Sequence, residues 1–179
     1  LLPPCRADAD AAFIVLQADK AHPMSGSNCI CVVTALLETG RLPMTEPETT
    51  VRLDTAAGLI VARAACANGR CLSVSLDNVP AFAVELDRDI RTTQFGTIRA
   101  DIAFGGVFYA LVDVARIGLT IAPEHARALA EAGIAIKADL KGQVDVSHPD
   151  IPGLNEVAYV MFRDRQPDGA IRTCTTLKP

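Results

Sequence analysis

Short apolar runs separated by polar turn residues follow one another along most of the chain, which predicts many short strands. Residues 11–16 form a continuous apolar run that is typical of a buried strand. Residues 59–66 and 71–76 are two further runs, and between them lies Asn68-Gly69, a dipeptide strongly favoured in two-residue hairpin turns. The pattern therefore predicts a β-hairpin over these two runs.

More strands are expected on both sides of this hairpin. The pair Gly105-Gly106 interrupts one long apolar stretch and predicts a junction or a kink between two strands. Turn residues at positions 166–169 predict a second hairpin near the end of the chain. The further strands are expected at residues 50–53, 83–86, 97–104, 107–113, 157–162 and 170–174.

Two segments depart from this pattern and predict helices. Residues 27–39 are apolar on nearly every side, follow good N-cap residues and end before Gly40, so we expect a fully buried helix. Residues 123–132 begin with a proline, mix charged with apolar positions and end before Gly133, which predicts an exposed amphipathic helix. A fully buried helix implies that strands surround it.

The expected fold class is therefore α+β. Antiparallel strands are expected to curl into a barrel around the central buried helix at about residues 27–39, followed by part of a second, similar lobe. The chain turns polar between residues 87 and 93, which indicates a boundary there. We expect a first lobe over residues 1–90 and a partial second lobe over residues 91–179.

Composition narrows the classes of function. The chain has 179 residues, of which 50% are hydrophobic and only 4% aromatic, so it can bury an aliphatic core. Its net charge of −4 and its lack of tryptophan argue against binding to nucleic acids or anionic membranes, which favour clustered Lys and Arg and stacking rings. No run reaches the roughly 20 apolar residues of a membrane-spanning helix. We expect neither a nucleic acid nor a membrane as a partner.

The six cysteines do not form a recognisable metal site. Cys29-Ile30-Cys31 is a C-x-C pair, and no second Cys/His pair follows at metal-ligand spacing, because His125 and His148 stand alone. Cys66 and Cys71 flank the predicted hairpin turn and are expected to act as small buried hydrophobes. Since the chain is long enough to fold without disulfides, we expect a cytoplasmic protein without a metal.

The N-terminus of the first predicted helix offers the most informative chemistry. The first backbone N–H groups of a helix have no intrahelical acceptor and carry about half a positive charge, which makes an anion site. Ser25 lies where a carboxylate would dock, and Gly26 gives the backbone beside it conformational freedom. The alternative is that Ser25 and Ser27 only cap the helix.

The segment Met24-Ser25-Gly26-Ser27-Asn28, followed by an apolar helix that ends before Gly40, resembles the first active-site motif of the proline racemase family. Residues 11–14 and 101–109 are also similar to that family, and the similarity covers essentially the whole chain. The family includes 4-hydroxyproline 2-epimerases and trans-3-hydroxy-L-proline dehydratases. The resemblance implies a diaminopimelate epimerase-like fold, with a barrel around a central helix.

The resemblance also implies a mechanism that needs no cofactor. Two side chains flank the α-carbon of the substrate; one removes the α-proton and the other returns a proton from the opposite face. The family's usual pair is two cysteines, and Ser25 stands at the first of these positions here. Gly26, Ser27 and Asn28 would donate backbone N–H groups to the substrate carboxylate and to the charge that develops on it.

The serine affects which reaction is expected. A serine hydroxyl is far harder to deprotonate than a cysteine thiol, whose pKa is about 8.5. Dehydration needs a strong base on one face only, so we expect trans-3-hydroxy-L-proline dehydration as the main reaction and 4-hydroxyproline 2-epimerisation as a second activity. One alternative is 2-epimerisation of 4-hydroxyproline or proline as the main activity. Another is a lobe that binds an amino acid without catalysis.

The family's second motif, an Asp-Arg-Ser-Pro-Cys-Gly-Thr-Gly-like segment that carries the other acid/base, does not occur in these residues. Cys174 lies in a strand-like stretch without that context. We therefore expect a chain cut at both ends, which holds half an active site and is inactive alone. The expected partner is a small molecule, hydroxyproline or proline, and a homodimer is left open.

Two further features are weaker candidates for the functional site. Phe104, Phe108 and Tyr109 lie around the glycine pair and either line an apolar pocket for a pyrrolidine ring or belong to a kinked strand. His22 lies close enough in sequence to assist Ser25, although no third, orienting acid is evident.

Overall fold

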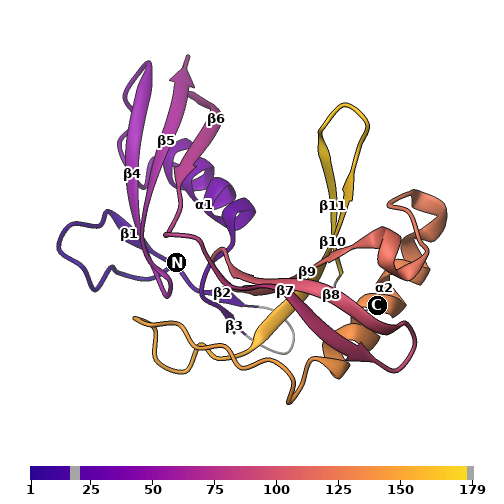
Figure 1. Cartoon of the computed structure of the whole chain (residues 1–179). Coiled ribbons are helices and arrows are strands. Elements are labelled where there is room, and N and C mark those ends of the chain that lie inside the picture. Colours follow the sequence, from indigo (N-terminus) through magenta and orange to yellow (C-terminus); the bar gives the residue numbers. More distant parts are fainter. Residues whose placement is uncertain (17–20, 177–179) are drawn as a thin grey trace. The chain divides into compact units, whose positions relative to one another are not determined.

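A computed structural model describes residues 1–16 and 21–176 of the chain (Figure 1). The chain divides into two compact units, Leu1–Pro80 and Ala81–Pro179, and each is treated by itself. Both units combine a β-sheet with helix, so the predicted α+β class is confirmed. Within the described residues, no helix has the length and apolar character that crossing a bilayer requires.

The division falls after Pro80, ten residues before the boundary that the sequence suggested. The polar segment that suggested the boundary is part of strand β7 (Phe82–Thr92). Most of its side chains are exposed because β7 lies at the edge of its sheet. An edge strand and a linker are both polar because both face water, so composition alone does not distinguish them.

The first unit contains a four-stranded sheet with the order β1-β4-β5-β6. Strand β1 runs parallel to β4, and the other neighbours are antiparallel. The apolar run at residues 11–16 is split between β1 and a short two-stranded sheet of β2 and β3, instead of forming one strand. The strands of the first unit are β1 (Ala11–Ala12), β2 (Val15–Leu16), β3 (Ala21–His22), β4 (Glu48–Thr55), β5 (Gly58–Ala67) and β6 (Arg70–Asp77).

The predicted hairpin is confirmed as β5 and β6. Its two turn residues, Asn68 and Gly69, have φ angles of 53° and 69°, which is the left-handed region that a type I′ turn requires at both central positions. A glycine reaches this region without strain, and asparagine tolerates it better than most other residues.

Helix α1 (Gly26–Glu38) packs against β5 and β6 (Figure 1). Every second residue of β5 faces it, and three of these residues, Ile60, Ala62 and Ala64, are fully buried. The small alanine side chains allow the helix to approach the sheet closely. The helix buries its opposing face at Cys29, Val33, Leu36 and Leu37.

The opposite face of α1 is exposed, which differs from the predicted fully buried helix. Ile30 is 40% exposed, and Cys31 and Ala35 also face water. In the part of the chain that the structure describes, the sheet is open and covers only one face of the helix. The expected barrel around a central helix is therefore not seen in these residues, because four strands in an open sheet do not surround a helix.

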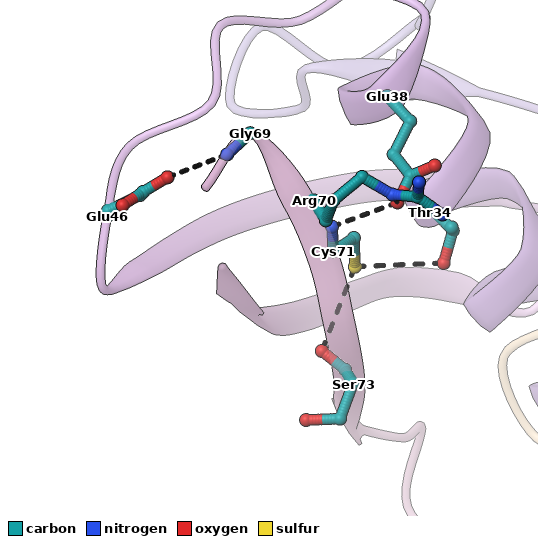
Figure 2. Close-up of polar contacts among 7 residues, drawn as sticks. All are labelled: Thr34, Glu38, Glu46, Gly69, Arg70, Cys71 and Ser73. Carbon is teal, nitrogen blue, oxygen red and sulfur yellow. Dashed lines mark hydrogen bonds and ion pairs between the residues drawn. The ribbon is translucent and has the colours of Figure 1, made fainter. Parts of the chain in front are cut away.

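Polar contacts hold the C-terminal half of α1 to β6 (Figure 2). One Glu38 carboxylate oxygen accepts hydrogen bonds from the Cys71 backbone N–H at 3.0 Å and from the Arg70 guanidinium at 3.1 Å. One turn earlier, the Thr34 hydroxyl lies 3.7 Å from the Cys71 sulfur. The two donors to Glu38 lower the pKa of its carboxyl, and the Cys71 N–H has a larger effect than the Arg70 guanidinium.

The segment between α1 and β4 contacts the hairpin turn as well, because the Gly69 N–H donates to the Glu46 carboxylate at 2.9 Å (Figure 2). Gly40, with φ of 70°, ends the helix as predicted, and its N–H donates to the Leu37 carbonyl. At the other end of α1, Gly26 lies beside Leu76 near the end of β6. Helix α1 thus runs antiparallel to β6 and is anchored at its C-terminal end.

The second unit contains a five-stranded sheet with the order β11-β10-β9-β8-β7. Strands β9 and β10 are parallel, which corrects the expectation of a purely antiparallel sheet. A parallel pair needs a crossover connection, and α2 (Ala126–Asp139) lies within it. Two short 3₁₀ helices, η1 (Val114–Ile117) and η2 (Pro123–His125), precede α2. The strands beyond β7 are β8 (Gly96–Phe104), β9 (Phe108–Asp113), β10 (Val157–Arg165) and β11 (Ile171–Thr176).

Helix α2 does not stop at Gly133 as the sequence predicted but continues to Asp139. Its amphipathic character is confirmed, with the buried face at Leu129, Ala132, Gly133 and Ile136. The glycine is explained by packing: a Cβ at position 133 would lie 2.6 Å from the Cβ of Thr176 on β11 and closer still to its hydroxyl. Thr176 is held there by donating to the Val160 carbonyl at 3.1 Å.

This close approach predicts the effect of replacing Gly133 in the full-length protein. In an unhindered helix, Gly→Ala stabilises by about 1 kcal/mol. Here we expect Gly133→Ala to lower the free energy of unfolding by about 1–3 kcal/mol, because Thr176 must move. The measurement is urea unfolding followed by circular dichroism. The double variant Gly133→Ala, Thr176→Gly should recover part of the loss, and a stabilised single variant would contradict the packing explanation.

The Glu38 contacts predict a pH-dependent contribution to stability. A carboxyl with a lowered pKa stabilises the fold above its ordinary pKa of about 4.5 and loses that contribution as pH falls through the lowered value. We expect Glu38→Gln to lower the thermal midpoint by about 1–2 °C at pH 7 and to have a smaller effect near pH 3, because the carboxylate is protonated to a greater extent there. Thermal scans at both pH values test this. Glu131→Gln, which removes an exposed pair with Arg127, is the control and should change the midpoint less.

Candidate active site

The predicted anion site lies at the N-terminus of α1, and the chain that leads into it is well anchored. The Pro23 carbonyl accepts a hydrogen bond from the Ala57 N–H at 3.2 Å. Met24 is buried, with 7% of its surface exposed, so it packs in the core. Ser25 follows as the N-cap residue in an extended conformation, with φ of −153° and ψ of 116°.

The backbone at this helix end provides donors. The first intrahelical bond runs from the Cys29 N–H to the Ser25 carbonyl at 3.0 Å. The N–H groups of Gly26, Ser27 and Asn28 precede that bond, and no residue in the described part of the chain accepts from them. The first turn also contains no acidic side chain that would compete for them. The helix end therefore presents donors and a partial positive charge to an external anion.

The Ser25 hydroxyl does not cap the helix, which removes the simplest structural explanation for this residue. Its oxygen instead accepts a hydrogen bond from the side-chain amide of Asn28 at 2.8 Å. The Ser27 hydroxyl lies 3.4 Å from the same oxygen, which is longer than a good O–H···O bond. Ser25, Ser27 and Asn28 thus form one polar cluster in the first turn of α1, and Ser25 is partly exposed within it.

The fold itself does not require a glycine at position 26. Gly26 begins the helix and is not among the residues with positive φ, so the expected conformational freedom is not used. A Cβ at this position would meet only the Leu76 side chain, at an ordinary contact distance of 3.8 Å. Glycine at the start of a helix offers close access to its N–H groups, and that property remains as a reason for it here.

Cys29 lies one turn further along α1 and is the nearest cysteine to Ser25 in the helix. It is fully buried, with 0% exposure. Burial raises the pKa of its thiol to about 11, so the thiol is neutral at pH 7. Cys29 is therefore a core residue, and Ser25 is the only one of the two that meets solvent.

The aromatic candidates near the glycine pair are explained by packing. Phe104 and Phe108 are buried, and their ring centroids lie 5.2 Å apart. Phe82 stacks on Phe104 at 5.2 Å, and the His148 ring approaches Phe104 edge-on at 4.5 Å. Gly105 donates its N–H to the Val107 carbonyl, so the glycine pair forms the junction between β8 and β9. The prediction of a junction between two strands at the glycine pair is confirmed.

Other side chains that the sequence offered have structural partners within their own units. Tyr109 stands beside Tyr159, with 5.8 Å between ring centroids, and burial raises the pKa of Tyr109. His22 is buried in β3, which pairs with β2. The Nδ1 atom of His125 lies 2.9 Å from the Thr120 hydroxyl.

No metal site is formed by the described residues, and a surface pocket of the first unit lies away from the cluster. Among residues 1–16 and 21–176, no group of three or more His, Cys, Asp or Glu side chains is placed to hold a metal ion. A surface pocket of about 450 Å³ in the first unit lies near the opposite end of α1, where Leu36, Arg41 and Leu42 contribute to its lining.

The side chain of Asn28 is the feature that sequence reasoning missed. The sequence indicated its backbone N–H as a donor and did not assign a role to its amide. A signal was present, because residues three apart lie on one face of a helix and Ser25 and Asn28 have this spacing.

Comparison with known proteins connects this cluster to a family. The sequence profile described as proline racemase matches residues 1–179, the whole of the chain. The chain belongs to the proline racemase family. The resemblance seen in Met24-Ser25-Gly26-Ser27-Asn28 is thus confirmed at the level of the family.

Curated members of the family are similar over the full chain. A protein from Allorhizobium ampelinum named 4-hydroxyproline 2-epimerase is 59% identical over 179 residues. A protein from Rhizobium rhizogenes named 4-hydroxyproline 2-epimerase 1 is 58% identical over 179 residues. The match covers 100% of this chain and 52% of each relative, so the chain spans about half the length of the curated relatives it matches.

Solved structures in the proline racemase family share the fold. A hydroxyproline epimerase from Agrobacterium vitis, crystallised with trans-4-hydroxy-L-proline, has a TM-score of 0.94 and 59% identity, covering 99% of this chain and 51% of that one. A probable proline racemase from Agrobacterium radiobacter, with bound carbonate, has a TM-score of 0.95 and 57% identity, covering 99% of this chain and 52% of that one.

Proposed function

We propose that this chain supplies one side of the active site of a cofactor-independent 4-hydroxyproline 2-epimerase. The proposal depends on one observation above all: the Ser25 hydroxyl is not used for capping and lies beside N–H groups without acceptors in the described residues. The names of the two curated relatives, and the hydroxyproline bound to the Agrobacterium vitis protein, support hydroxyproline as the substrate class. The second acid/base belongs to the motif that these residues lack.

The substrate carboxylate would bind to the N–H groups of Gly26, Ser27 and Asn28. Removal of the α-proton from an amino acid places negative charge on its carboxylate as the carbanion delocalises. Donors that are already oriented at the start of α1 stabilise this charge without reorganisation. The partial positive charge of the helix end acts in the same direction.

Ser25 would exchange a proton with the α-carbon on one face of the ring. In one direction its neutral hydroxyl donates a proton to the carbanion and becomes an alkoxide; in the other, the alkoxide removes the α-proton. The acid/base on the opposite face completes the inversion, so one proton leaves and one arrives in each turnover. No redox step and no external reactant is needed.

Epimerisation replaces dehydration as the main activity that we expected from the sequence. The relatives are named for 4-hydroxyproline and for 2-epimerisation. The chemistry agrees with this choice, because elimination needs a leaving group on the carbon next to the α-carbon. The hydroxyl of 4-hydroxyproline is one carbon further away, so carbanion formation on this substrate leads to inversion.

We also propose that the exposed face of α1 is covered in the whole protein, which would complete the barrel. Ile30, Cys31 and Ala35 place apolar surface on that face, and the chain spans about half the length of its relatives. Exposure of an apolar helix face to water is unfavourable. We therefore expect residues from outside this chain to cover this face.

Replacing Ser25 tests the function. In the full-length protein, Ser25→Ala should reduce 4-hydroxyproline epimerisation by about 10²–10⁴-fold, because one proton transfer is lost. Chiral chromatography of the product and α-deuterium incorporation in D₂O measure it. Ser75→Ala, at an exposed position on β6, is the matched control. Wild-type protein that releases a Δ1-pyrroline from trans-3-hydroxy-L-proline but does not epimerise would favour dehydration, and full activity in Ser25→Ala would overturn the proposal.

Replacing Gly26 separates substrate binding from folding. Because the added methyl group has space beside Leu76, Gly26→Ala should leave the thermal midpoint unchanged or slightly raised. The same methyl group would lie beside the carboxylate donors, so KM for 4-hydroxyproline should rise about tenfold or more. Steady-state kinetics and a thermal scan of the full-length variant provide both values. A normal KM would place the carboxylate elsewhere.

A further inference from the structure

The amide of Asn28 has an unusual place in the first turn of α1. Asn28 is the third residue of the helix, and its amide nitrogen donates to the Ser25 oxygen at 2.8 Å. In the common capping box, the N-cap hydroxyl accepts from the backbone N–H of the third residue, whose acidic side chain accepts in return. Here the third residue donates with its side chain instead.

This exchange has two consequences for the cluster. The backbone N–H of Asn28 is not consumed by the Ser25 hydroxyl, so it remains available to a ligand. The Ser25 oxygen receives a neutral donor from a side chain with only two rotatable bonds, which restrains its direction. Neither consequence is needed for helix stability, since an ordinary Ser cap would satisfy one more backbone group.

We propose that Asn28 is a positioning residue for Ser25, a role that rests on the proposed epimerase function. Its amide occupies one acceptor site of the Ser25 oxygen and directs the hydroxyl proton away from the helix, toward the α-carbon of the substrate. It also donates to the alkoxide that forms when Ser25 gives up this proton.

The balance of donors at the Ser25 oxygen supports the role. A hydroxyl has one donor and two acceptor sites, so accepting from Asn28 leaves its proton free to be transferred. A hydrogen bond to an ionised acceptor is about twice as strong as a neutral one. The Asn28 hydrogen bond therefore strengthens as the proton leaves Ser25. This favours the alkoxide, which is the state that a serine reaches least readily. Ser27, at 3.4 Å, is too distant to replace it.

The first experiment measures this effect without turnover. In a full-length Ser25→Cys variant, the introduced thiol reports how well the site stabilises an anion at position 25. Its rate of alkylation by iodoacetamide is measured against pH, with tandem mass spectrometry to separate it from Cys29 and Cys31. Adding Asn28→Ala should slow alkylation at pH 7 by about three- to tenfold, because less thiolate is present. Adding Asn28→Asp should slow it by more than about tenfold, because a carboxylate repels the thiolate.

The second experiment measures catalysis with Ser25 in place. Asn28→Ala and Asn28→Asp should lower kcat for 4-hydroxyproline by about ten- to a hundredfold. For Asn28→Ala, KM should stay within about twofold, since the amide contacts Ser25 and not the substrate. Misfolding does not account for a loss in Asn28→Asp, because an acidic residue in the first turn stabilises a helix. A thermal scan checks this.

The outcomes separate the inference from the function it rests on. Slower alkylation together with a loss in kcat supports the positioning role. Unchanged alkylation, an unchanged kcat, or a raised KM at normal kcat for Asn28→Ala overturns it while the function of Ser25 stands. Full activity in Ser25→Ala overturns the function itself. Asn78→Ala, at an exposed asparagine in the same unit, is the control and should change neither readout.

Discussion

The candidate site at the start of α1 depends on one hydrogen bond, from the Asn28 amide to the Ser25 oxygen at 2.8 Å. A helix end normally satisfies part of its own donors by capping with a side chain. In this chain the hydroxyl of the N-cap residue Ser25 accepts a hydrogen bond from the Asn28 side chain. The first backbone N–H groups of the helix therefore have no side-chain acceptor at the cap. Backbone donors for a proposed anion site, a partly exposed hydroxyl and a donor to that hydroxyl thus share a single helical turn. The candidate chemistry follows from this one departure from ordinary capping.

The rest of the first unit holds that turn in place. The C-terminal half of α1 is fixed to β6 through Glu38, whose carboxylate binds the Arg70 side chain and the Cys71 N–H. Along the helix, Cys29 and Val33 are completely buried against small residues of β5. At the far end, the Ala57 N–H holds the Pro23 carbonyl just before Ser25. The first turn of α1, with the candidate site, is therefore supported by packing on one side and by backbone hydrogen bonding before it.

Much of the secondary structure was predictable because it depends on local preferences. Asn68-Gly69 adopts the turn that the dipeptide favours, and Gly40 ends α1 in the left-handed conformation that glycine allows. Gly133 shows the limit of such reasoning. A glycine after an apolar stretch predicts a helix end, yet α2 passes through it because Thr176, distant in sequence, packs against its backbone. The same holds for β7, whose polar edge resembles a linker.

By itself the sequence indicated the segment from Met24 to Asn28 as the candidate site and the α+β class, since these follow from residue types at fixed spacing. The family was indicated by the resemblance of that segment to a known motif. The tertiary structure decided which of these groups are used. It placed Cys29 in the core and left Ser25 partly exposed, although both lie within one turn of the same helix. The physical reason is that burial depends on which face of α1 meets β5 and β6, and neighbours along the chain do not specify that face.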